Sequence, residues 1–245
     1  MDNPEGSQER RLLKKLKIMN EKKKLHRKGS YKNLKITREI RDIIHGYIMS
    51  DGYVNKTGYL AIEQSKKQLK FVEWLYQKFK DLRTETRIRE ISRTDKRTNT
   101  QTFSAKFQTK SLLHGYHSMW YKLVTTSDPA TGKDKIAYKK VLPKSIACFF
   151  SPTFIALWFA GDGTRTLGSK GAKFEVTNYS PKDRLKLQAL FKKKYDIEAS
   201  IIRVGVSKSG TEQWSISILS KDYDKFKKII TQIDLIPTLF PNKLH

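Results

Sequence analysis

The stretch Phe154-Ile-Ala-Leu-Trp-Phe-Ala-Gly-Asp-Gly-Thr-Arg165 decides the fold of this chain. An almost wholly apolar run ends in one carboxylate, Asp162, which is followed by glycine. A helix that is apolar on all sides must be buried, so an acid at its end needs an explanation. An earlier stretch, IIHGYIMSDGYV (43–54), has the same arrangement and ends in Asp51-Gly52. The two acids must therefore be explained as a pair.

The order of predicted elements around each Asp-Gly pair is the same. In the first half, apolar spacing predicts helices at 37–50, 66–80 and 111–123 and strands at 58–64, 86–93 and 101–108. In the second half it predicts helices at 152–161, 180 onward and 222–233 and strands at 172–178, 199–206 and 213–219. Ser151-Pro152 and Ser180-Pro181 carry the residues of helix starts. The segment TTSDPATGKDK (125–135) has turn residues and no periodicity, which is typical of a linker.

These elements predict an α+β fold of two tandem αββαββα halves with antiparallel sheets. The expected division is a basic N-terminal arm at 1–35, a first half at 36–124, a linker at 125–144 and a second half at 145–245. We expect the arm to lack fixed structure and to add nonspecific affinity for a polyanion.

Charge indicates the kind of partner. The chain has 50 Lys and Arg against 24 Asp and Glu, a net charge of +26, and residues 1–35 account for only +8 of it. A basic folded region, and not only a basic tail, indicates an extended polyanion, and nucleic acid is the leading candidate. No run is long enough to span a bilayer, and no Cys/His cluster has zinc spacing. The single cysteine, Cys148, is expected to be buried.

The strands indicate where nucleic acid would bind. Apolar and polar residues alternate at 101–108 and 213–219, which predicts sheets with one packed face and one solvated face. The side chains expected at the solvated faces are mostly basic residues, amides and hydroxyls, types that bind base edges and phosphates. They are Arg87, Arg89, Arg93, Thr102, Ser104, Lys106, Lys173, Glu175, Thr177, Arg203, Gln213, Ser215 and Ser217. For a single strand a solvated edge is the alternative, but the bias is shared by strands of both halves.

The two aspartates lie at the unfavourable end of their helices. Glycine after aspartate predicts a left-handed helix end, so each carboxylate meets the negative end of a helix dipole, at a cost of about 0.3–1 kcal/mol. If the helices pack side by side, a divalent cation would neutralise the converging charge. Gly46 and Gly161 favour close packing, whereas Leu157, which matches Gly46, makes close packing doubtful one turn before the Asp-Gly ends.

At this point the chain resembles a single-chain LAGLIDADG homing endonuclease. The nine motif positions correspond to Ile44–Gly52 and Ile155–Gly163, and the metal-binding acid of the motif to Asp51 and Asp162. The stretches KKVLPKSI and IPTLFPNKL resemble family segments that carry a basic residue near each scissile phosphate, here Lys140 and Lys243. In a chain with 50 basic residues, either lysine could equally be a backbone contact or a solvated charge.

The resemblance implies site-specific, metal-dependent hydrolysis of double-stranded DNA, one phosphodiester per strand, with 3′ overhangs. Mg²⁺ is the implied cofactor, with Mn²⁺ or Ca²⁺ able to substitute for binding. It would be held by Asp51 and Asp162 with help from the Ser50 and Gly161 carbonyls, and Lys140 and Lys243 would stabilise developing charge.

The same resemblance implies a monomer with pseudo-two-fold symmetry whose sheets form a DNA-binding saddle. The implied target is long and weakly palindromic. An intron-encoded protein of this kind acts in intron homing in a mitochondrion or chloroplast.

Two alternatives remain open. The first is an intron RNA maturase or another non-cleaving nucleic-acid-binding protein on the same fold, and the second is a basic RNA-associated protein with no catalytic site. Both Asp51 and Asp162 are present, which favours the nuclease, and the second alternative leaves the duplicated Asp-Gly pair unexplained.

Overall fold

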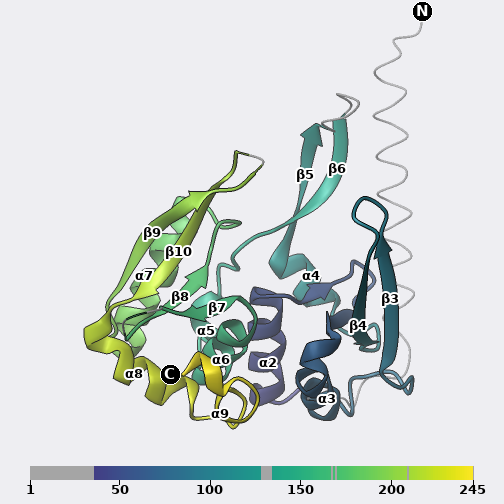
Figure 1. The fold of residues 1–245 in the computed structure, drawn as a ribbon, viewed down its shortest axis with the longest axis horizontal. Coiled ribbons are helices and arrows are strands. Elements are labelled where there is room, and N and C mark those ends of the chain that lie inside the picture. The colour runs from purple at the N-terminus through teal and green to yellow at the C-terminus, as the bar shows by residue number, and fades with distance from the viewer. Residues whose placement is uncertain (1–35, 128–133, 167, 169, 209, 245) are drawn as a thin grey trace, which may run out of the picture. The chain divides into compact units, whose positions relative to one another are not determined.

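The computed structural model describes residues 36–127, 134–166, 168, 170–208 and 210–244 (Figure 1). The predicted arm at 1–35 lies outside the described residues. The first half has the elements α2 (Arg38–Met49), β1 (Tyr53–Val54), β2 (Leu60–Ser65), η1 (Lys66–Gln68), α3 (Leu69–Lys78), β3 (Arg89–Asp95), β4 (Thr100–Gln108) and α4 (His114–Trp120).

The second half repeats this order after the short helix α5 (Ile146–Phe149). Its elements are α6 (Pro152–Asp162), β7 (Gly163–Arg165), β8 (Ala172–Glu175), α7 (Pro181–Tyr195), β9 (Ala199–Val206), β10 (Glu212–Ile218), η2 (Ser220–Asp222) and α8 (Tyr223–Ile230), followed by α9 (Ile236–Leu239) and η3 (Pro241–Lys243). The α+β fold of two tandem αββαββα halves is therefore confirmed.

The two sheets are built alike. Both are antiparallel and four-stranded, with the orders β1-β2-β4-β3 and β7-β8-β10-β9. Tyr53 pairs with Ala61 in the first sheet, and Thr164 pairs with Lys173 in the second. Tyr53 and Thr164 each lie two residues after the motif aspartate of their half. Their strand partners, Ala61 and Lys173, are therefore equivalent positions of the two halves.

Local sequence signals begin the helices as predicted. The Ser151 hydroxyl accepts a hydrogen bond from the Phe154 amide at 3.2 Å. The Ser180 hydroxyl accepts one from the Asp183 amide at 3.2 Å and donates to the Asp183 carboxylate at 2.7 Å, a reciprocal cap. The last helix differs from the prediction, because Ser220 begins the 3₁₀ turn η2 and α8 starts only at Tyr223.

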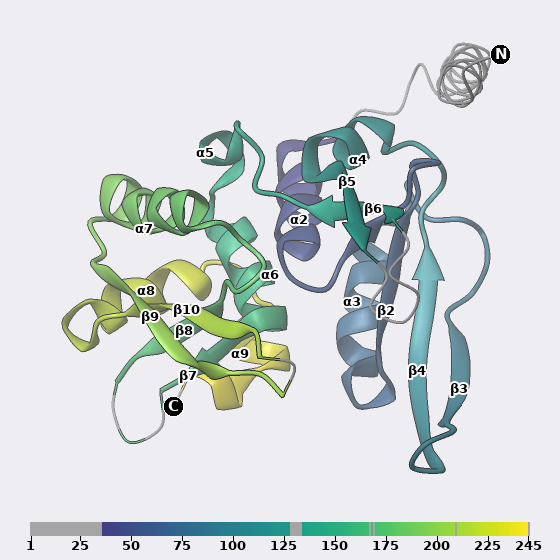
Figure 2. The same cartoon turned by 90° about the horizontal axis from the view of Figure 1, so that it is seen from above.

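The core is formed where the helices cover one face of each sheet. The helices α2 and α6 lie side by side at the centre (Figure 2), and the side chains of residues 154–160 in α6 are all buried. The second-half core is aromatic, with Trp158 4.1 Å from Phe174 between ring centroids and Phe174 5.6 Å from Phe191. Among the described residues, no helix has the length and apolar character needed to cross a membrane.

The expected linker contains regular structure. Residues on either side of 128–133 form an antiparallel ribbon, β5 (Tyr121–Ser127) and β6 (Asp134–Lys140), and the helix expected at 111–123 is shortened to α4 because β5 begins at Tyr121. Cys148, expected to be buried, is exposed. The helix α5 buries Ile146 and Phe149 and leaves the cysteine on its outer side.

Candidate active site

The two motif helices approach each other closely one turn before their ends. A β-carbon added to Gly46 would lie 2.6 Å from the Phe154 carbonyl oxygen and 2.7 Å from the Leu157 β-carbon. The doubt that Leu157 raised about close packing at this point was therefore wrong. One glycine is enough, because its missing side chain leaves the space that the backbone and Leu157 of α6 occupy.

The helices are equally close at their C-terminal ends, the helix tips, where Asp51 and Asp162 lie. A β-carbon on Gly161 would lie 2.5 Å from the β-carbon of Ser50 and 2.7 Å from the Asp51 carboxylate. The carboxylate of Asp51 thus lies against the residue that precedes Asp162. The two acidic tips converge, as the pair of Asp-Gly sequences predicted.

The glycines that follow the aspartates do not end the helices in the way predicted. Gly163 has φ −83°, and Gly52 is also outside the left-handed region. Both glycines are required by space instead. A β-carbon on Gly52 would lie 2.7 Å from the Tyr47 carbonyl oxygen, and one on Gly163 would lie 2.0 Å from the Phe159 ring.

A lysine binds the carbonyl groups at the end of each motif helix. The ammonium of Lys140 donates to the Ile48 carbonyl at 2.6 Å and to the Ser50 carbonyl at 2.8 Å. The ammonium of Lys243 donates to the carbonyls of Phe159, Ala160 and Gly163 at 2.9, 2.8 and 2.7 Å. Each lysine binds carbonyl groups at a helix end, of which that of Phe159 also accepts from the Gly163 amide, and places a positive charge at the negative end of the dipole.

The electrostatics show that Asp162, Lys140 and Lys243 share one partly buried environment beside the exposed Asp51 carboxylate. Burial and the neighbouring Asp51 carboxylate raise the pKa of Asp162 to about 7, and Lys140 opposes that shift. Burial lowers the pKa of Lys243 to about 8 and lowers the pKa of Lys140, while both aspartates act in the opposite direction. An acid whose charge is this unfavourable at neutral pH is typical of a site that receives a cation.

The tip of α2 has two further polar partners that sequence reasoning did not single out. The Gln64 amide donates to the Asp51 carboxylate at 3.0 Å and to the Tyr47 hydroxyl at 3.2 Å. The Tyr179 hydroxyl, which comes from the second half, donates to the Met49 carbonyl at 3.2 Å. Tyr179 lies four residues after the end of β8 in sequence and could not be placed at α2 without the fold.

The oxygen-rich donor set at the tips fits a hard divalent cation. It consists of the Asp51 and Asp162 carboxylates and backbone carbonyls, which such ions prefer. The Ser50 carbonyl, expected to help hold the metal, accepts from Lys140 here. Within the described part of the chain, no group of three or more His, Cys, Asp and Glu side chains could hold an ion by itself.

The solvated faces of both sheets carry most of the expected DNA-contacting side chains. In the first sheet, cross-strand pairing places Arg89 opposite Lys106, Arg93 opposite Thr102, and Ser104 opposite Ile91. In the second sheet, Lys173 pairs with Ser217, and Glu175 pairs with Ser215. Arg87 is exposed just before β3, and Gln213 is exposed on β10.

Three second-sheet expectations need correction. Arg203 pairs with Trp214 in the same register as the pairs from Ser215 to Ile218, so it lies on the side of the sheet that carries Trp214, where its exposed guanidinium forms an ion pair with Glu212 at 3.2 Å. Ser215 is only 7% exposed because it lies on a central strand between Glu175 and Ile202. Thr177 lies beyond the end of β8, and its hydroxyl accepts from the Trp214 amide at 2.9 Å.

An acid on the first solvated face was also missed. Glu63 accepts hydrogen bonds from Arg93 and from the Ser104 hydroxyl and lies 3.5 Å from the Lys106 ammonium. These bonds, with Arg93 the largest contributor, lower the pKa of Glu63 to about 2. The register makes Glu63 the equivalent of Glu175, but Glu63 lies 12 residues after Asp51 and Glu175 lies 13 residues after Asp162, so only the strand pairing reveals the equivalence.

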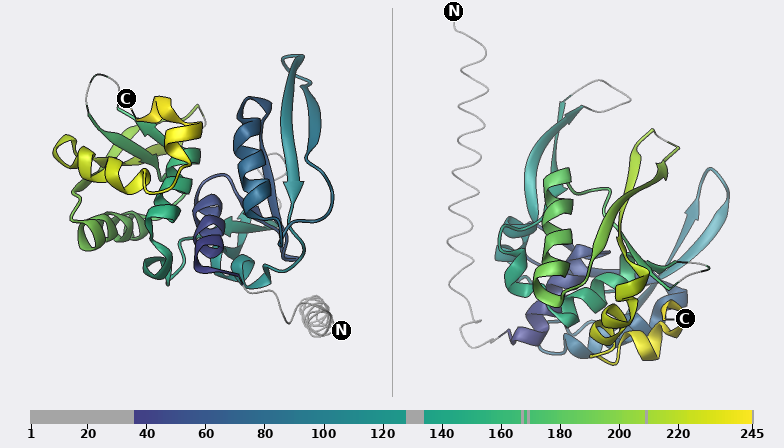
Figure 3. Two further views of the ribbon diagram at one scale, coloured as in Figure 1. Left: turned by 90° about the horizontal axis from the view of Figure 1, so that it is seen from below. Right: turned by 90° about the vertical axis from the view of Figure 1, so that its left-hand side faces the viewer.

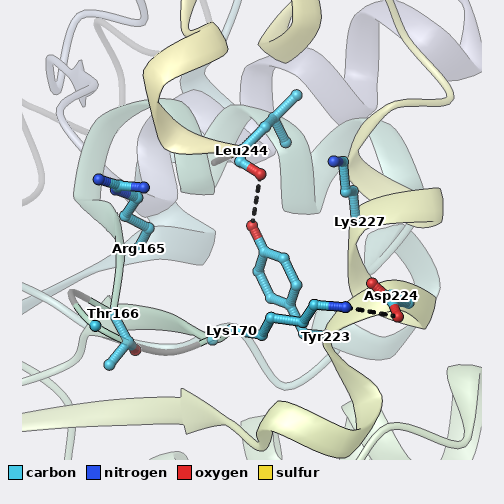
Figure 4. A pocket seen from close by; sticks show the side chains of 9 residues that line it. Arg165, Thr166, Lys170, Tyr223, Asp224, Lys227 and Leu244 are labelled. Carbon is cyan, nitrogen blue, oxygen red and sulfur yellow. Dashed lines mark hydrogen bonds and ion pairs between the residues drawn. The ribbon is translucent and has the colours of Figure 1, made fainter.

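The hollow in Figure 4 is separate from the helix tips. It encloses about 500 Å³ beside β7 and α8, with Arg165, Lys170 and Lys227 around it. The Tyr223 hydroxyl donates to the Leu244 carbonyl at 3.2 Å within it. Neither motif aspartate nor either tip lysine lines it, so it does not form part of the site.

The site therefore has two acidic helix tips. A lysine binds each tip, and a sheet with a polar solvated face lies beside each. These features lead to a family assignment. Residues 41–226 match the profile of the LAGLIDADG DNA endonuclease family. The chain belongs to this family. The motif of the family corresponds here to the facing helices α2 and α6.

Comparison with solved structures gives one clear superposition. The homing endonuclease I-WcaI, solved bound to its DNA recognition sequence, superposes with a TM-score of 0.66 at 17% identity over 89% of this chain and 96% of that chain. Mesophilic variants of the homing endonuclease I-DmoI give a TM-score of 0.48 at 14% identity over 81% of this chain and 98% of that chain. The I-WcaI likeness shows a common fold.

A curated relative carries another activity in its name. The cytochrome b mRNA maturase bI2 of Debaryomyces hansenii is 32% identical over 82 residues, 34% of this chain. The matched part spans 29% of that maturase. This LAGLIDADG chain therefore resembles only a part of it.

Proposed function

We propose that this protein is a site-specific endonuclease that hydrolyses one phosphodiester in each strand of double-stranded DNA with a divalent metal and leaves 3′ overhangs. The observation that carries the proposal is the convergence of Asp51 and Asp162, with a lysine at each helix end. Two similar sites side by side fit two antiparallel strands, because a two-fold axis relates the strands of a duplex as it relates the halves of this chain.

Asp51 and Asp162 would hold the metal, and Mg²⁺ is the ion we propose. When bound, the ion polarises the phosphoryl oxygen and lowers the pKa of the attacking water. Lys140 and Lys243 provide preorganised positive charge within the same partly buried environment, where it stabilises charge that develops on the phosphate. Their lowered pKa values show the cost of keeping these ammonium groups out of water.

The solvated sheet faces would position the duplex. They present arginines, lysines, hydroxyls and Gln213, which bind phosphates and base edges. A long, weakly palindromic target fits halves that share a register but differ in side chains, since the first sheet has Ala61 and Gln108 at the pair where the second has Lys173 and Ser217. One chain supplies both halves, so we propose a monomer.

A cleavage assay tests the proposal. A plasmid carrying the two sequences that flank the gene in its genome, joined as in an uninterrupted site, is incubated with purified protein and Mg²⁺. We expect linear product with 3′ overhangs. Asp162→Asn should reduce cleavage by at least ~10³-fold and leave affinity for the target nearly unchanged, because its loss removes transition-state stabilisation. Normal cleavage by that variant would rule out the site.

The resemblance to the Debaryomyces maturase favours a second function, in intron RNA splicing. An intron-encoded protein of this kind would act in a mitochondrion or chloroplast. If the purified protein cuts no target in a randomised duplex library yet binds its own intron RNA tightly, the maturase function is the correct one.

A further inference from the structure

The ribbon formed by β5 and β6 exposes apolar side chains. Leu123 is 57% exposed, Ile136 58% and Tyr138 41%. Leu123 pairs with Tyr138, and Thr125 pairs with Ile136, so these side chains share one face of the ribbon. A two-stranded hairpin in water is at best marginally stable, so an exposed apolar face on one indicates a partner that covers it.

The apolar face of the ribbon continues into the helix tips. Tyr121 and Lys140 are a cross-strand pair two residues before Leu123 and two after Tyr138, and they lie on the same face. The Tyr121 hydroxyl donates to the Gly52 carbonyl at 3.4 Å, and Lys140 binds the end of α2. The apolar strip therefore begins at the place where the proposed function requires a phosphodiester.

The opposite face of the ribbon is basic. Lys122 pairs with Lys139 there, and both are exposed. In Figures 1 and 3 the ribbon extends to the same side of the helices as the β3–β4 and β9–β10 hairpins, whose sheets present the solvated faces. A partner that covers the strip therefore also meets basic side chains and lies along the two sheets. These two properties favour duplex DNA over an apolar protein surface.

We propose that the β5–β6 ribbon is a DNA-contacting arm that packs Leu123, Ile136 and Tyr138 against the sugars of the minor groove beside the bonds to be cut. This inference rests on the proposed function. The strip contains no arginine or amide for reading base edges, whereas apolar side chains are typical of contacts that widen or kink the minor groove. The long side chains of Lys122 and Lys139 are placed to reach the flanking phosphates.

The test compares Leu123→Thr/Ile136→Thr with Leu185→Thr. Leu185 on α7 is 58% exposed, so it is a matched control for removing exposed aliphatic surface away from the ribbon. Threonine has the β-branched shape that strands favour, and thermal melts should confirm that both variants remain folded. Affinity is measured in Ca²⁺ with the intact duplex that the protein cuts in Mg²⁺. A hydroxyl-radical footprint of the same complex reports which sugars in the minor groove are protected.

We expect the ribbon variant to lose about 10- to 100-fold in affinity and the protection at the base pairs around the cut, with its base preference at the ends of the site unchanged. The Leu185 variant should match wild type. Wild-type affinity and footprint in a folded ribbon variant would overturn the inference and leave the endonuclease intact. If wild type were a dimer and the ribbon variant a monomer, the inference would also be overturned, because a second copy of the chain would then cover the strip. If wild type binds no duplex, both proposals fail.

Discussion

The ends of α2 and α6 are alike in plan and different in detail. Each has an aspartate, a following glycine that packs against its own helix, and a lysine that binds the terminal carbonyls. At the α2 tip, Asp51 is exposed and is held by Gln64. At the α6 tip, Asp162 is more buried and carries the raised pKa. A duplicated sequence therefore does not give two equivalent sites, because each half contributes different neighbours to the shared surface.

The largest expected effect concerns the lysines. Lys140→Met and Lys243→Met should each slow cleavage of one strand by about 10²–10³-fold and let a nicked duplex accumulate, because each ammonium serves the helix end that it binds. Duplexes labelled on one strand at a time should show that the two variants spare opposite strands. Equal slowing of both strands by either variant would mean that the tips act as one site.

A second variant tests the close approach of the helices. Gly46→Ala should lower the free energy of unfolding by about 2–3 kcal/mol, because the new methyl group meets the Phe154 backbone of α6. Gly115→Ala in α4 is the control, since a β-carbon there meets nothing within 4 Å, and it should stabilise by about 0.5–1 kcal/mol. Chemical denaturation measures both. Equal stability of the two variants would contradict the packing described.

The charge on Asp162 should make stability depend on pH. Its folded pKa of about 7 lies above the ordinary value of 3.8, so the metal-free protein loses stability as pH rises from about 4 to 7. Asp162→Asn should remove this loss, raising stability above pH 7 by about 2 kcal/mol and leaving it unchanged near pH 4. Thermal melts in EDTA across this range provide the measurement.

Asp196 is the control of opposite sign. The Lys192 and Lys225 ammonium groups lower its pKa to about 2, so Asp196→Asn should lose stability above pH 4. If both aspartate variants changed in the same direction, the electrostatic account of the α6 tip would be wrong.

The smallest expected effect comes from making the α2 tip resemble the α6 tip. The register places Val176 where the first half has Gln64. Gln64→Val should remove the amide that holds Asp51 and slow cleavage of one strand by roughly 3- to 10-fold, as expected for one hydrogen bond of about 1 kcal/mol. Strand-specific rates would detect this change. An unchanged rate would show that Asp51 needs no support from the sheet.

Sequence reasoning recovered the elements that short-range patterns encode. Caps at Ser151 and Ser180, the helical spacing before Asp51, and the alternation in β4 and β10 are all local signals. The β5–β6 ribbon was missed, although Lys122 separates Tyr121 from Leu123 and Lys139 separates Tyr138 from Lys140. The turn residues between them masked the pattern, and the chain itself offers no core against which that alternation can pack.

The sequence by itself determined the repeat, the positive charge, the two acidic helix ends and the two lysines, because each of these is a matter of residue type and spacing. Only the tertiary structure decided that Gly46 would fit against Leu157, that Gln64 and Tyr179 would reach the end of α2, and that Arg203 would share the side of its sheet with Trp214. These facts depend on distances between residues far apart in the chain and on the register in which the strands pair, which no local pattern encodes.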